Sequence, residues 1–317
     1  MARAEQIKSL IKSYLDNDKD RFVTIALQVA AHEARQGHAG LADDIRQMVD
    51  KSKVRSLNVT ALNHGMSELV DTLNNDVRLS ELVVSNALKK RIERILHEFR
   101  QQEKLKRHGL NNRRKILLTG PPGTGKTMTA SVIAGELKLP CYVIQMDKLV
   151  TKYMGETSVK LRQIFHTIEQ YRGVFLFDEF DAIGAERGLN NDVGEMRRVL
   201  NSFLQFIEND DSGSLIIAAT NNMQLLDQAL YRRFDDILYY DLPNTKEIEK
   251  LISNRLGLYK TNFSLEPIAE KARGLSHAEI SRACLDSIKE TVLSEKTKVT
   301  KELLLSCLQE RQTAYKR

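Results

Sequence analysis

One eight-residue stretch constrains this chain more than any other feature. Residues 120–127 read Gly-Pro-Pro-Gly-Thr-Gly-Lys-Thr and fit the pattern G-x-x-x-x-G-K-[ST]. The strand-like run Ile116–Thr119 comes directly before this stretch, and a helix-like segment through Glu136 follows it. A strand that turns through glycines into a helix aims backbone N–H groups and the positive end of the helix at the turn. The stretch therefore predicts a phosphate-binding loop.

The side chains of this loop indicate which ligand it takes. We expect Lys126 to reach the β- and γ-phosphates of a nucleotide, and the Thr127 hydroxyl to bind Mg²⁺. The loop and the residue after it supply the expected ATP contacts, namely Gly120, Pro121, Pro122, Gly123, Thr124, Gly125, Lys126, Thr127 and Met128.

Two other apolar runs end in polar side chains suited to phosphate chemistry. The run at 174–177 is followed by Asp178 and Glu179. We expect Asp178 to hold Mg²⁺ through water and Glu179 to polarise the attacking water. The run at 215–220 is followed by Asn221, which is placed to touch the γ-phosphate or the water. This pattern predicts hydrolysis of the nucleotide.

The spacing of the apolar runs predicts the fold class. Short runs that are apolar throughout are typical of strands buried on both faces, and here they alternate with helix-like segments. We therefore expect an α/β fold, a parallel sheet with helices on both faces, and a wholly helical region after Pro243. The expected strands are Ile116–Thr119, Cys141–Met146, Val174–Phe177, Leu215–Thr220 and Ile237–Tyr240.

The remaining segments complete the expected domain organisation. Residues 1–51 show three short amphipathic patterns and predict a small helical bundle. Residues 52–80 lack a sustained period and predict a linker with a short helix at Met66–Leu73. The α/β ATPase region then covers 81–241, and a helical lid covers 242–317.

The basic residues of the chain are concentrated in one segment. The net charge is +6, and residues 76–115 alone hold 12 Lys and Arg against 5 Asp and Glu. Ser85–Arg107 carries an apolar stripe and a basic face, which predicts an amphipathic helix. This face fits either a solvated helix surface or a patch for nucleic acid or an acidic partner.

Composition and cysteine spacing exclude several classes of protein. Hydrophobic residues at 42% and charged residues at 28% exclude a wholly disordered chain. The apolar runs are too short to span a bilayer, which takes about 20 residues. The first ten residues alternate in charge, unlike a secretory signal, and three widely spaced cysteines fit a reducing compartment. We therefore expect a cytoplasmic protein without a membrane segment.

Taken in order, these elements resemble the AAA+ ATPases over residues 81–317. Within that superfamily the chain is similar to the group that contains katanin, spastin and the membrane-bound AAA proteases. Three further stretches carry the resemblance, namely Asp181-Ala-Ile-Gly184, Glu195-Met-Arg-Arg-Val-Leu-Asn201 and Gly274-Leu-Ser-His-Ala-Glu-Ile280.

The resemblance implies a ring, usually a hexamer, with ATP at the subunit interfaces. It implies that Arg232 and Arg233 act in trans as arginine fingers. It also implies that Tyr153 and Met154 form a pore loop that grips a protein substrate. Two further ATP contacts follow from the resemblance, Val83 beside the adenine and Ala278 in the lid.

The chain also departs from the family pattern in two places. Asp235 and Asp236 stand where relatives usually carry a basic residue. The Asp-Gly-aromatic stretch used for signalling between subunits is absent, and residues 207–212 occupy its region. The resemblance therefore supports nucleotide binding more strongly than coupling between subunits.

Three functions remain open at this point. The leading hypothesis is an ATP-driven motor that remodels, unfolds or threads proteins. The alternatives are a nucleic-acid-dependent switch that uses the basic helix, and a scaffold in which ATP drives only assembly; Glu179 argues against the scaffold. The sequence contains neither H-E-x-x-H nor G-x-S-x-G, so any proteolysis is expected from a partner. The layout is similar to that of bacterial ATPases that work beside a separate subtilisin-like serine protease. In this chain we expect such a protease to dock through residues 1–51.

Overall fold

The computed structural model describes most of the chain. The described residues are 8, 13, 19–38, 40–46, 70–73, 75–149, 156–182, 193–222, 228–260 and 263–314. The chain divides into two compact units, Met1–Ser67 and Glu68–Arg317. The finer division that the sequence suggests stays a prediction.

The larger unit is built on a six-stranded sheet in the order β1-β3-β4-β5-β2-β6. Strands β2 to β6 are parallel, and β1 pairs antiparallel with β3 at one edge. The parallel order confirms the predicted fold class. The strands are β1 (Val70–Leu73), β2 (Lys115–Thr119), β3 (Cys141–Gln145), β4 (Val174–Asp178), β5 (Leu215–Thr220) and β6 (Asp236–Tyr239).

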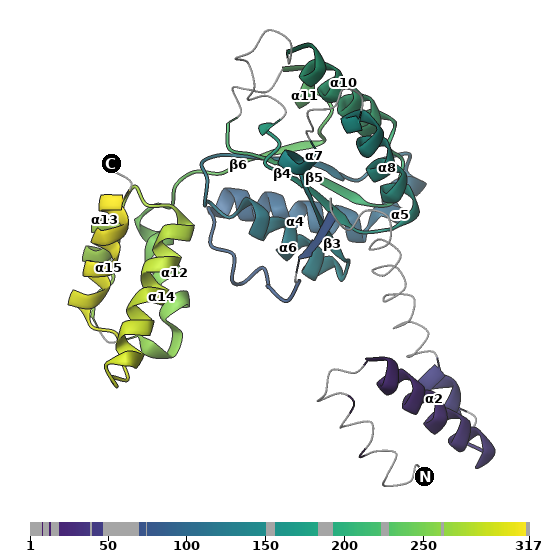
Figure 1. The fold of residues 1–317 in the computed structure, drawn as a ribbon, viewed down its shortest axis with the longest axis horizontal. Helices are drawn as coiled ribbons and strands as arrows, with labels where there is room; N and C mark the ends of the chain where they lie inside the picture. The colour runs from purple at the N-terminus through teal and green to yellow at the C-terminus, as the bar shows by residue number, and fades with distance from the viewer. Residues whose placement is uncertain are drawn as a thin grey trace. The chain divides into compact units, whose positions relative to one another are not determined.

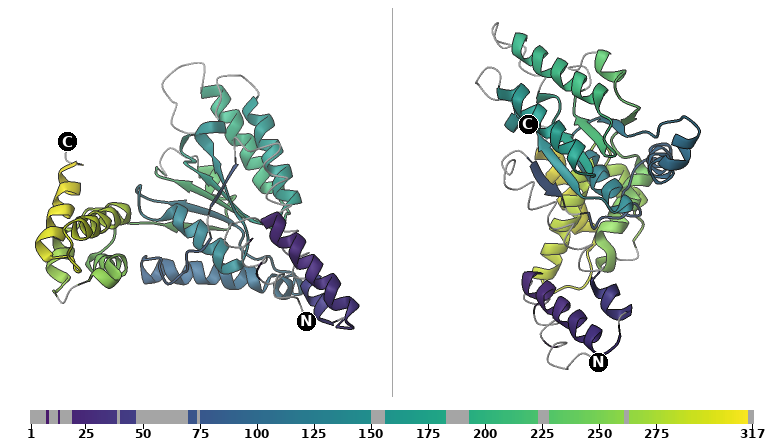
Figure 2. Two further views of the ribbon diagram at one scale, coloured as in Figure 1. Left: turned by 60° about the horizontal axis from the view of Figure 1, so that its bottom comes forward. Right: turned by 90° about the vertical axis from the view of Figure 1, so that its right-hand side faces the viewer.

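Helices cover both faces of this sheet (Figures 1 and 2). Helices α4 and α6 lie together on one face, and α8 and α10 pair on the other. The helices of this part are α4 (Asn86–Arg100), α5 (Gln102–Arg107), α6 (Lys126–Leu137), α7 (Met146–Leu149), α8 (Glu156–Gln170), α10 (Val193–Asn209) and α11 (Gln228–Tyr231).

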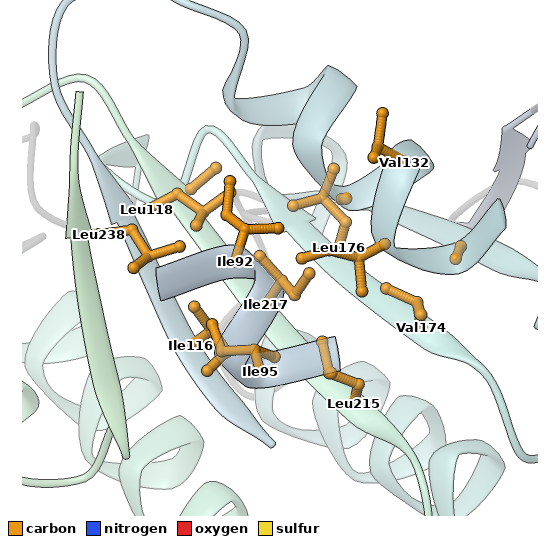
Figure 3. Packing of buried hydrophobic residues seen from close by; sticks show 14 of the residues in the cluster. Ile92, Ile95, Ile116, Leu118, Val132, Val174, Leu176, Leu215, Ile217 and Leu238 are labelled. Atoms are coloured by element: carbon orange, nitrogen blue, oxygen red, sulfur yellow. The ribbon is translucent and has the colours of Figure 1, made fainter. Parts of the chain in front are cut away.

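The strands alternate their side chains between two apolar layers. On one face, Ile92 and Ile95 of α4 pack on Ile116, Leu176 and neighbouring strand residues (Figure 3). Each of these four side chains is less than 2% exposed, so the sheet centre is excluded from water. Burial of this kind stabilises the fold by about 1.5–3 kcal/mol for each large aliphatic side chain.

Aromatic rings fill the other face of the sheet. Phe177 of β4 contacts Phe165 of α8 and Phe203 of α10, with ring centroids 5.7 and 5.0 Å apart. Phe180, which follows β4, packs on the same Phe203 ring at 4.5 Å. The residues just after β4 are therefore anchored from beneath by a well-packed aromatic cluster.

The C-terminal region is helical, as the sequence predicts, and the structure shows that it has its own apolar core. Ile248, Ile252, Ile280 and Leu304 are fully buried within that core. In this article "lid" denotes residues 242–317. Its elements are α12 (Thr245–Leu256), the 3₁₀ turn η2 (Gly257–Tyr259), α13 (Glu266–Lys271), α14 (His277–Leu293) and α15 (Lys301–Ala314).

Two local predictions are wrong. The helix expected at Met66–Leu73 is an edge strand over Val70–Leu73, because the free edge of β3 supplies hydrogen-bond partners that a single segment cannot reveal. The single helix expected at Ser85–Arg107 is broken at Gln101. The second part, α5, contains no fully buried residue, so little apolar burial favours its alignment with α4.

The smaller unit contains α2 (Lys19–Arg35), which agrees with the second predicted N-terminal helix, and residues 40–46 are helical as well. The first predicted helix falls mainly outside the described residues. Within the described part of both units, no helix combines the length and the apolar character needed to cross a membrane.

Candidate functional site

A cavity of about 440 Å³ lies where the phosphate loop, the ends of the central strands and the lid meet. Cavities of this size suit a small ligand such as a nucleotide. From the sheet side it is lined by Pro122, Gly123, Thr124, Gly125, Lys126, Thr127, Met128, Asp178, Glu179 and Asn221. From the lid and the segment before α4 it is lined by Glu81, Leu82, Val83, Leu251, Arg255, His277, Ala278 and Ser281.

The shape of the phosphate loop requires glycine at two positions, because a side chain at either one would clash with its neighbours. Gly120 has φ +145°, and a Cβ there would lie 2.1 Å from the Tyr240 carbonyl oxygen. Gly123 has φ +71°, and its Cβ would lie 2.6 Å from Ser276 Oγ. At these two positions the loop passes too close to Tyr240, which follows β6, and to Ser276 of the lid for a side chain to fit.

Lys126 is the first residue of α6 and is almost buried, at 7% exposed. Its ammonium donates hydrogen bonds to the carbonyl oxygens of Gly120, at 2.7 Å, and Pro121, at 2.8 Å. Burial lowers the pKa of Lys126 to about 8, and the nearby charge of Asp178 opposes that shift. An anion in the cavity would stabilise the protonated amine, because an opposite charge favours the charged form. Gly120 and Pro121 themselves do not line the cavity.

Oxygen ligands meet beside this amine. Thr127 Oγ1 donates a hydrogen bond of 2.8 Å to Asp178 Oδ2, which joins the start of α6 to the end of β4. A hydroxyl and a carboxylate are oxygen donors of the kind that Mg²⁺ accepts.

Glu179 adopts an unusual backbone conformation for a residue with a side chain, with φ +52°. The next residue explains it, since Phe180 N donates to the Ala219 carbonyl at 2.8 Å and its ring is fully buried. Glu179 itself is exposed and lines the cavity. The turn thus directs the chain so that Glu179 lies in the cavity wall next to Asp178, and such strained positions cluster at functional sites.

Asn221 begins the loop after β5 and also lines the cavity. Its backbone N–H donates to Asp181 Oδ1 at 3.2 Å, which ties this loop to the loop after β4. The carboxyl ends of β4 and β5 lie side by side in the sheet, so these polar groups converge as the sequence predicts.

The lid contributes the opposite wall through the start of α14. Ser276 caps this helix, accepting from Glu279 N at 3.3 Å while the Glu279 carboxylate accepts from Ser276 N at 2.6 Å. The cap places Ala278 N within 2.9 Å of the Gly123 carbonyl oxygen, to which it donates. The lid therefore touches the phosphate loop directly.

Several lid residues in this wall were absent from the predicted set. The sequence pointed to Ala278 alone, whereas His277 and Ser281 of α14 and Arg255 of α12 line the cavity too. Arg255 Nε donates to Ser281 Oγ at 3.2 Å, which joins the two helices. The signal was present, because His277 and Ser281 fall in or next to the stretch 274–280 that carries the resemblance.

The two predicted arginines lie away from this cavity. Arg232 is exposed in the turn after α11, and Arg233 Nε lies 2.9 Å from Glu208 Oε2 of α10. Neither lines the cavity of its own chain. Tyr153 and Met154 fall outside the described residues, so the structure says nothing of them.

The basic segment is partly neutralised within the chain. Arg91 pairs with Asp236, and Arg113 pairs with both Glu98 and Asp236. Asp235 accepts from the backbone N–H groups of residues 114 and 115 at 2.8 and 2.9 Å. The two aspartates that depart from the family pattern thus hold the basic segment against the start of β6.

Comparison with known proteins places these features in a family. Residues 116–242 match the family model described as "ATPase family associated with various cellular activities (AAA)". An uncharacterized AAA family ATPase of Sinorhizobium fredii is 32% identical over 308 residues, which cover 94% of this chain and 92% of that protein.

Two further relatives are more distant. The ATP-dependent zinc metalloprotease FtsH 2 of Sphaerobacter thermophilus is 26% identical over 80% of this chain but only 40% of the protease. A protein of Methanothermobacter marburgensis described as a 26S proteasome regulatory subunit homolog is 26% identical over 84% of this chain and 73% of that protein. Because the Sinorhizobium similarity runs along nearly the whole of both chains and the phosphate loop lies within the matched region, this chain belongs to the AAA family of ATPases.

Proposed function

We propose that this AAA ATPase is a protein-remodelling motor in which hydrolysis of ATP moves the lid against the sheet. The observation that carries the proposal is the composition of the cavity wall. One side holds Lys126, Asp178 and Glu179, and the other side holds residues of α12 and α14. A nucleotide that contacts both sides stabilises one arrangement of the lid, and loss of its γ-phosphate removes part of that stabilisation.

The proposed chemistry assigns a role to the main residues on both sides of the cavity. Lys126 and the backbone N–H groups of the loop bind the phosphates. Glu179 accepts a proton from the attacking water, and Asn221 orients that water against the γ-phosphate. Val83 and Ala278 contact the base end of the nucleotide.

Thr127 and Asp178 are proposed to hold Mg²⁺, and their 2.8 Å contact is compatible with that role. When bound, the ion neutralises negative charge on the phosphate oxygens.

Membership of the AAA family suggests an oligomeric assembly, and we propose that the ring is a hexamer. Arg232 and Arg233 lie outside the cavity of their own chain, which supports a role at a neighbouring site, and Arg233 would exchange its ion pair with Glu208 for that role. Either Arg→Ala variant should bind ATP without hydrolysing it, and mixing with Glu179→Gln subunits should restore part of the activity. Hydrolysis by an Arg232→Ala, Arg233→Ala double variant that sediments as a monomer would contradict the trans role.

Protein is the proposed substrate class. The relatives' names describe a protease and a proteasome regulatory subunit, both of which act on proteins. We propose that Tyr153 and Met154 grip the threaded chain, and that a separate subtilisin-like protease docks on residues 1–51. Nearly equal partner sets for the full chain and a chain lacking residues 1–51 would contradict the docking role.

A nucleic-acid-dependent switch is the second candidate. The basic segment 76–115 favours it, but the internal ion pairs of Arg91, Arg113 and Arg114 reduce the charge available to phosphates. A steep loss of DNA or RNA binding with rising salt, together with stimulation of ATP hydrolysis, would support this candidate against the motor.

Capture of substrate in the ATP-bound state tests the motor directly. Glu179→Gln protein with ATP should retain bound polypeptides that the Glu179→Gln, Tyr153→Ala double variant does not retain. Mass spectrometry of the captured material identifies them. Equal capture by both variants, or capture of nucleic acid alone, would contradict protein threading.

A further inference from the structure

The sheet core and the lid core adjoin at two places along the chain. At the first, Leu82 packs into the sheet core and the adjacent Val83 packs into the lid core. At the second, Tyr240 is 3% exposed within the sheet core, and the lid begins two residues later. Leu82 and Val83 line the cavity directly, whereas Tyr240 reaches it only through other residues.

Tyr240 bonds to residues on both sides of the phosphate loop. Its main-chain N–H donates to the Thr119 carbonyl oxygen at 2.7 Å, just before the loop. Its phenol hydroxyl donates to Thr129 Oγ1 at 2.7 Å, near the start of α6 and just after the loop. Its own carbonyl oxygen leaves no space for a Cβ at Gly120. One residue outside the loop therefore contacts the chain where the loop begins and where it ends.

The hydroxyl of Thr129 extends this contact into the loop. It donates to the Gly125 carbonyl oxygen at 3.0 Å, and the Thr129 main-chain N–H donates to the same oxygen at 2.9 Å. Because a carbonyl oxygen can only accept, the single hydroxyl proton of Thr129 is used on Gly125, and the Tyr240 hydroxyl must be the donor to Thr129. Hydrogen bonds joined in series polarise and strengthen one another.

The peptide unit between Gly125 and Lys126 connects this series of bonds to the cavity. Its carbonyl oxygen points along α6 toward Thr129, and its N–H, which belongs to Lys126, points the opposite way because the unit is planar and trans. The Lys126 N–H is among the first four N–H groups of α6, which have no acceptor within the helix. Gly125 and Lys126 both line the cavity. The two donors that hold the Gly125 carbonyl therefore also fix the direction of a main-chain N–H at the cavity.

We propose that Tyr240 is a positioning residue for phosphate binding, which acts through Thr129 by holding the carbonyl oxygen of Gly125. This inference rests on the proposed function, in which the main-chain N–H groups of the loop bind the phosphates of ATP. A misdirected N–H bonds more weakly to a phosphate oxygen, because a hydrogen bond weakens as its angle departs from linear. The effect should fall on binding and not on the chemical step, because Glu179 and Asn221 take no part in this series of bonds.

A second buried tyrosine separates this role from simple burial. Tyr142 of β3 is fully buried, and its hydroxyl has no hydrogen-bond partner within the described part of the chain. Tyr142→Phe therefore removes a hydroxyl that makes no bond, whereas Tyr240→Phe removes one that bonds to Thr129. Each substitution removes one atom from a buried ring, so a general effect of that change on packing should appear in both variants.

The test compares full-length variants in titration with a non-hydrolysable ATP analogue and in steady-state hydrolysis of ATP. Tyr240→Phe removes the first hydroxyl, and Thr129→Val removes the second while keeping the branched shape. Thr129→Ser keeps a hydroxyl that can bond to both neighbours, and Tyr142→Phe is the matched control. The Tm of each variant is measured as well, because a merely structural role would lower the Tm and leave the affinity unchanged.

We expect Tyr240→Phe to weaken affinity for the analogue by about threefold to tenfold and Thr129→Val to weaken it at least as much, with kcat within about twofold. Thr129→Ser should keep most of the parental affinity, and Tyr142→Phe should keep all of it. The Tyr240→Phe, Thr129→Val double variant should bind no more weakly than Thr129→Val alone, because the two hydroxyls act in series.

Parental affinity in both Tyr240→Phe and Thr129→Val would overturn the inference, even with a lower Tm, because the hydroxyls would then serve stability alone. Losses that multiply in the double variant would also overturn it, because the two hydroxyls would then act independently. A parent protein that binds the analogue but does not hydrolyse ATP would instead overturn the proposed function, and the affinities of the variants would still decide the inference.

Discussion

The sheet side and the lid side of the cavity differ in how their polar side chains are satisfied. On the sheet side, Lys126 and the Thr127–Asp178 pair make hydrogen bonds of 2.7–2.8 Å before any ligand is considered. On the lid side, the ring of His277 has no such bond among the described residues, and Arg255 is bonded only to its neighbour Ser281. The polar groups of the sheet side are thus already ordered to bind a charged ligand. On the lid side, a ligand bound between the two walls would supply the missing hydrogen-bond partners.

The largest effect of breaking the sheet side should come from Glu179. Glu179→Gln removes the carboxylate and keeps the size, so turnover should fall by about 10²–10⁴ while ATP binding survives. Phosphate release and equilibrium binding measure the two quantities, with Glu302→Gln, at an exposed position of α15, as the control. Turnover at the parental rate would show that Glu179 is not the base.

Lys126→Ala should affect binding, because it removes the charge that the loop holds for the phosphates. We expect ATP affinity to fall by about 10²-fold or more, consistent with the strength of charge-assisted contacts to phosphate. Calorimetric titration with ATP measures it, and Lys104→Ala on the exposed surface of α5 is the control. An equal loss of ATP affinity in Lys126→Ala and Lys104→Ala would show that the phosphates do not bind at this loop.

Gly123→Ala separates contact with the lid from backbone strain. Gly109 has nearly the same φ, +72° against +71°, but nothing lies within 4 Å of a Cβ there. Both substitutions carry the strain of a left-handed conformation, roughly 1–2 kcal/mol, while only Gly123→Ala meets Ser276. We expect a tenfold or greater rise in the KM for ATP in Gly123→Ala alone. Equal KM values for ATP in the two variants would mean that contact with the lid does not determine the conformation of the phosphate loop.

The smallest expected effect is the pH dependence that His277 adds on the lid side. Its folded pKa is near 4, below the ordinary value of 6.5, so the unfolded chain takes up the proton first. The contribution of His277 to stability is therefore complete above about pH 6.5 and is lost as the pH falls toward 4. The fall in Tm over that window should be smaller in His277→Gln, by about 2–4 °C for each kcal/mol removed. Parallel Tm profiles for the two proteins would contradict this contribution.

The same difference between the walls explains how much the sequence could reveal. The run Leu215–Thr220 is a strand with those bounds, and the phosphate loop and Asp178 meet in one cavity as expected. Each of these features depends on a continuous stretch of sequence. A buried parallel strand is an apolar run, and the polar residues that follow the run mark the end of the strand. The role of each residue in the cavity remains a prediction.

The features that sequence reasoning missed depend on a distant partner. Val70–Leu73 is a strand because the edge of β3 lies beside it, and the four residues alone carry no such information. His277 enters the cavity wall because a helix cap fixes the start of α14 there, and the same wall includes Val83, about 190 residues earlier in the chain. The hydrophobic periodicity of a single segment cannot predict which distant segment will lie beside it.

The peptide bond between Leu82 and Val83 has a consequence for how the larger unit comes apart. A linker of several residues would let the lid and the sheet melt as separate cooperative units. Here Leu82 is buried in one core and Val83 in the other, with a single planar amide between them. Any movement of the lid away from the sheet therefore displaces Val83, and the adjacent Leu82 transmits that displacement to the sheet core. In hydrogen exchange, the amides of α4 and α14 should lose protection together, and a bound nucleotide should delay both to the same extent.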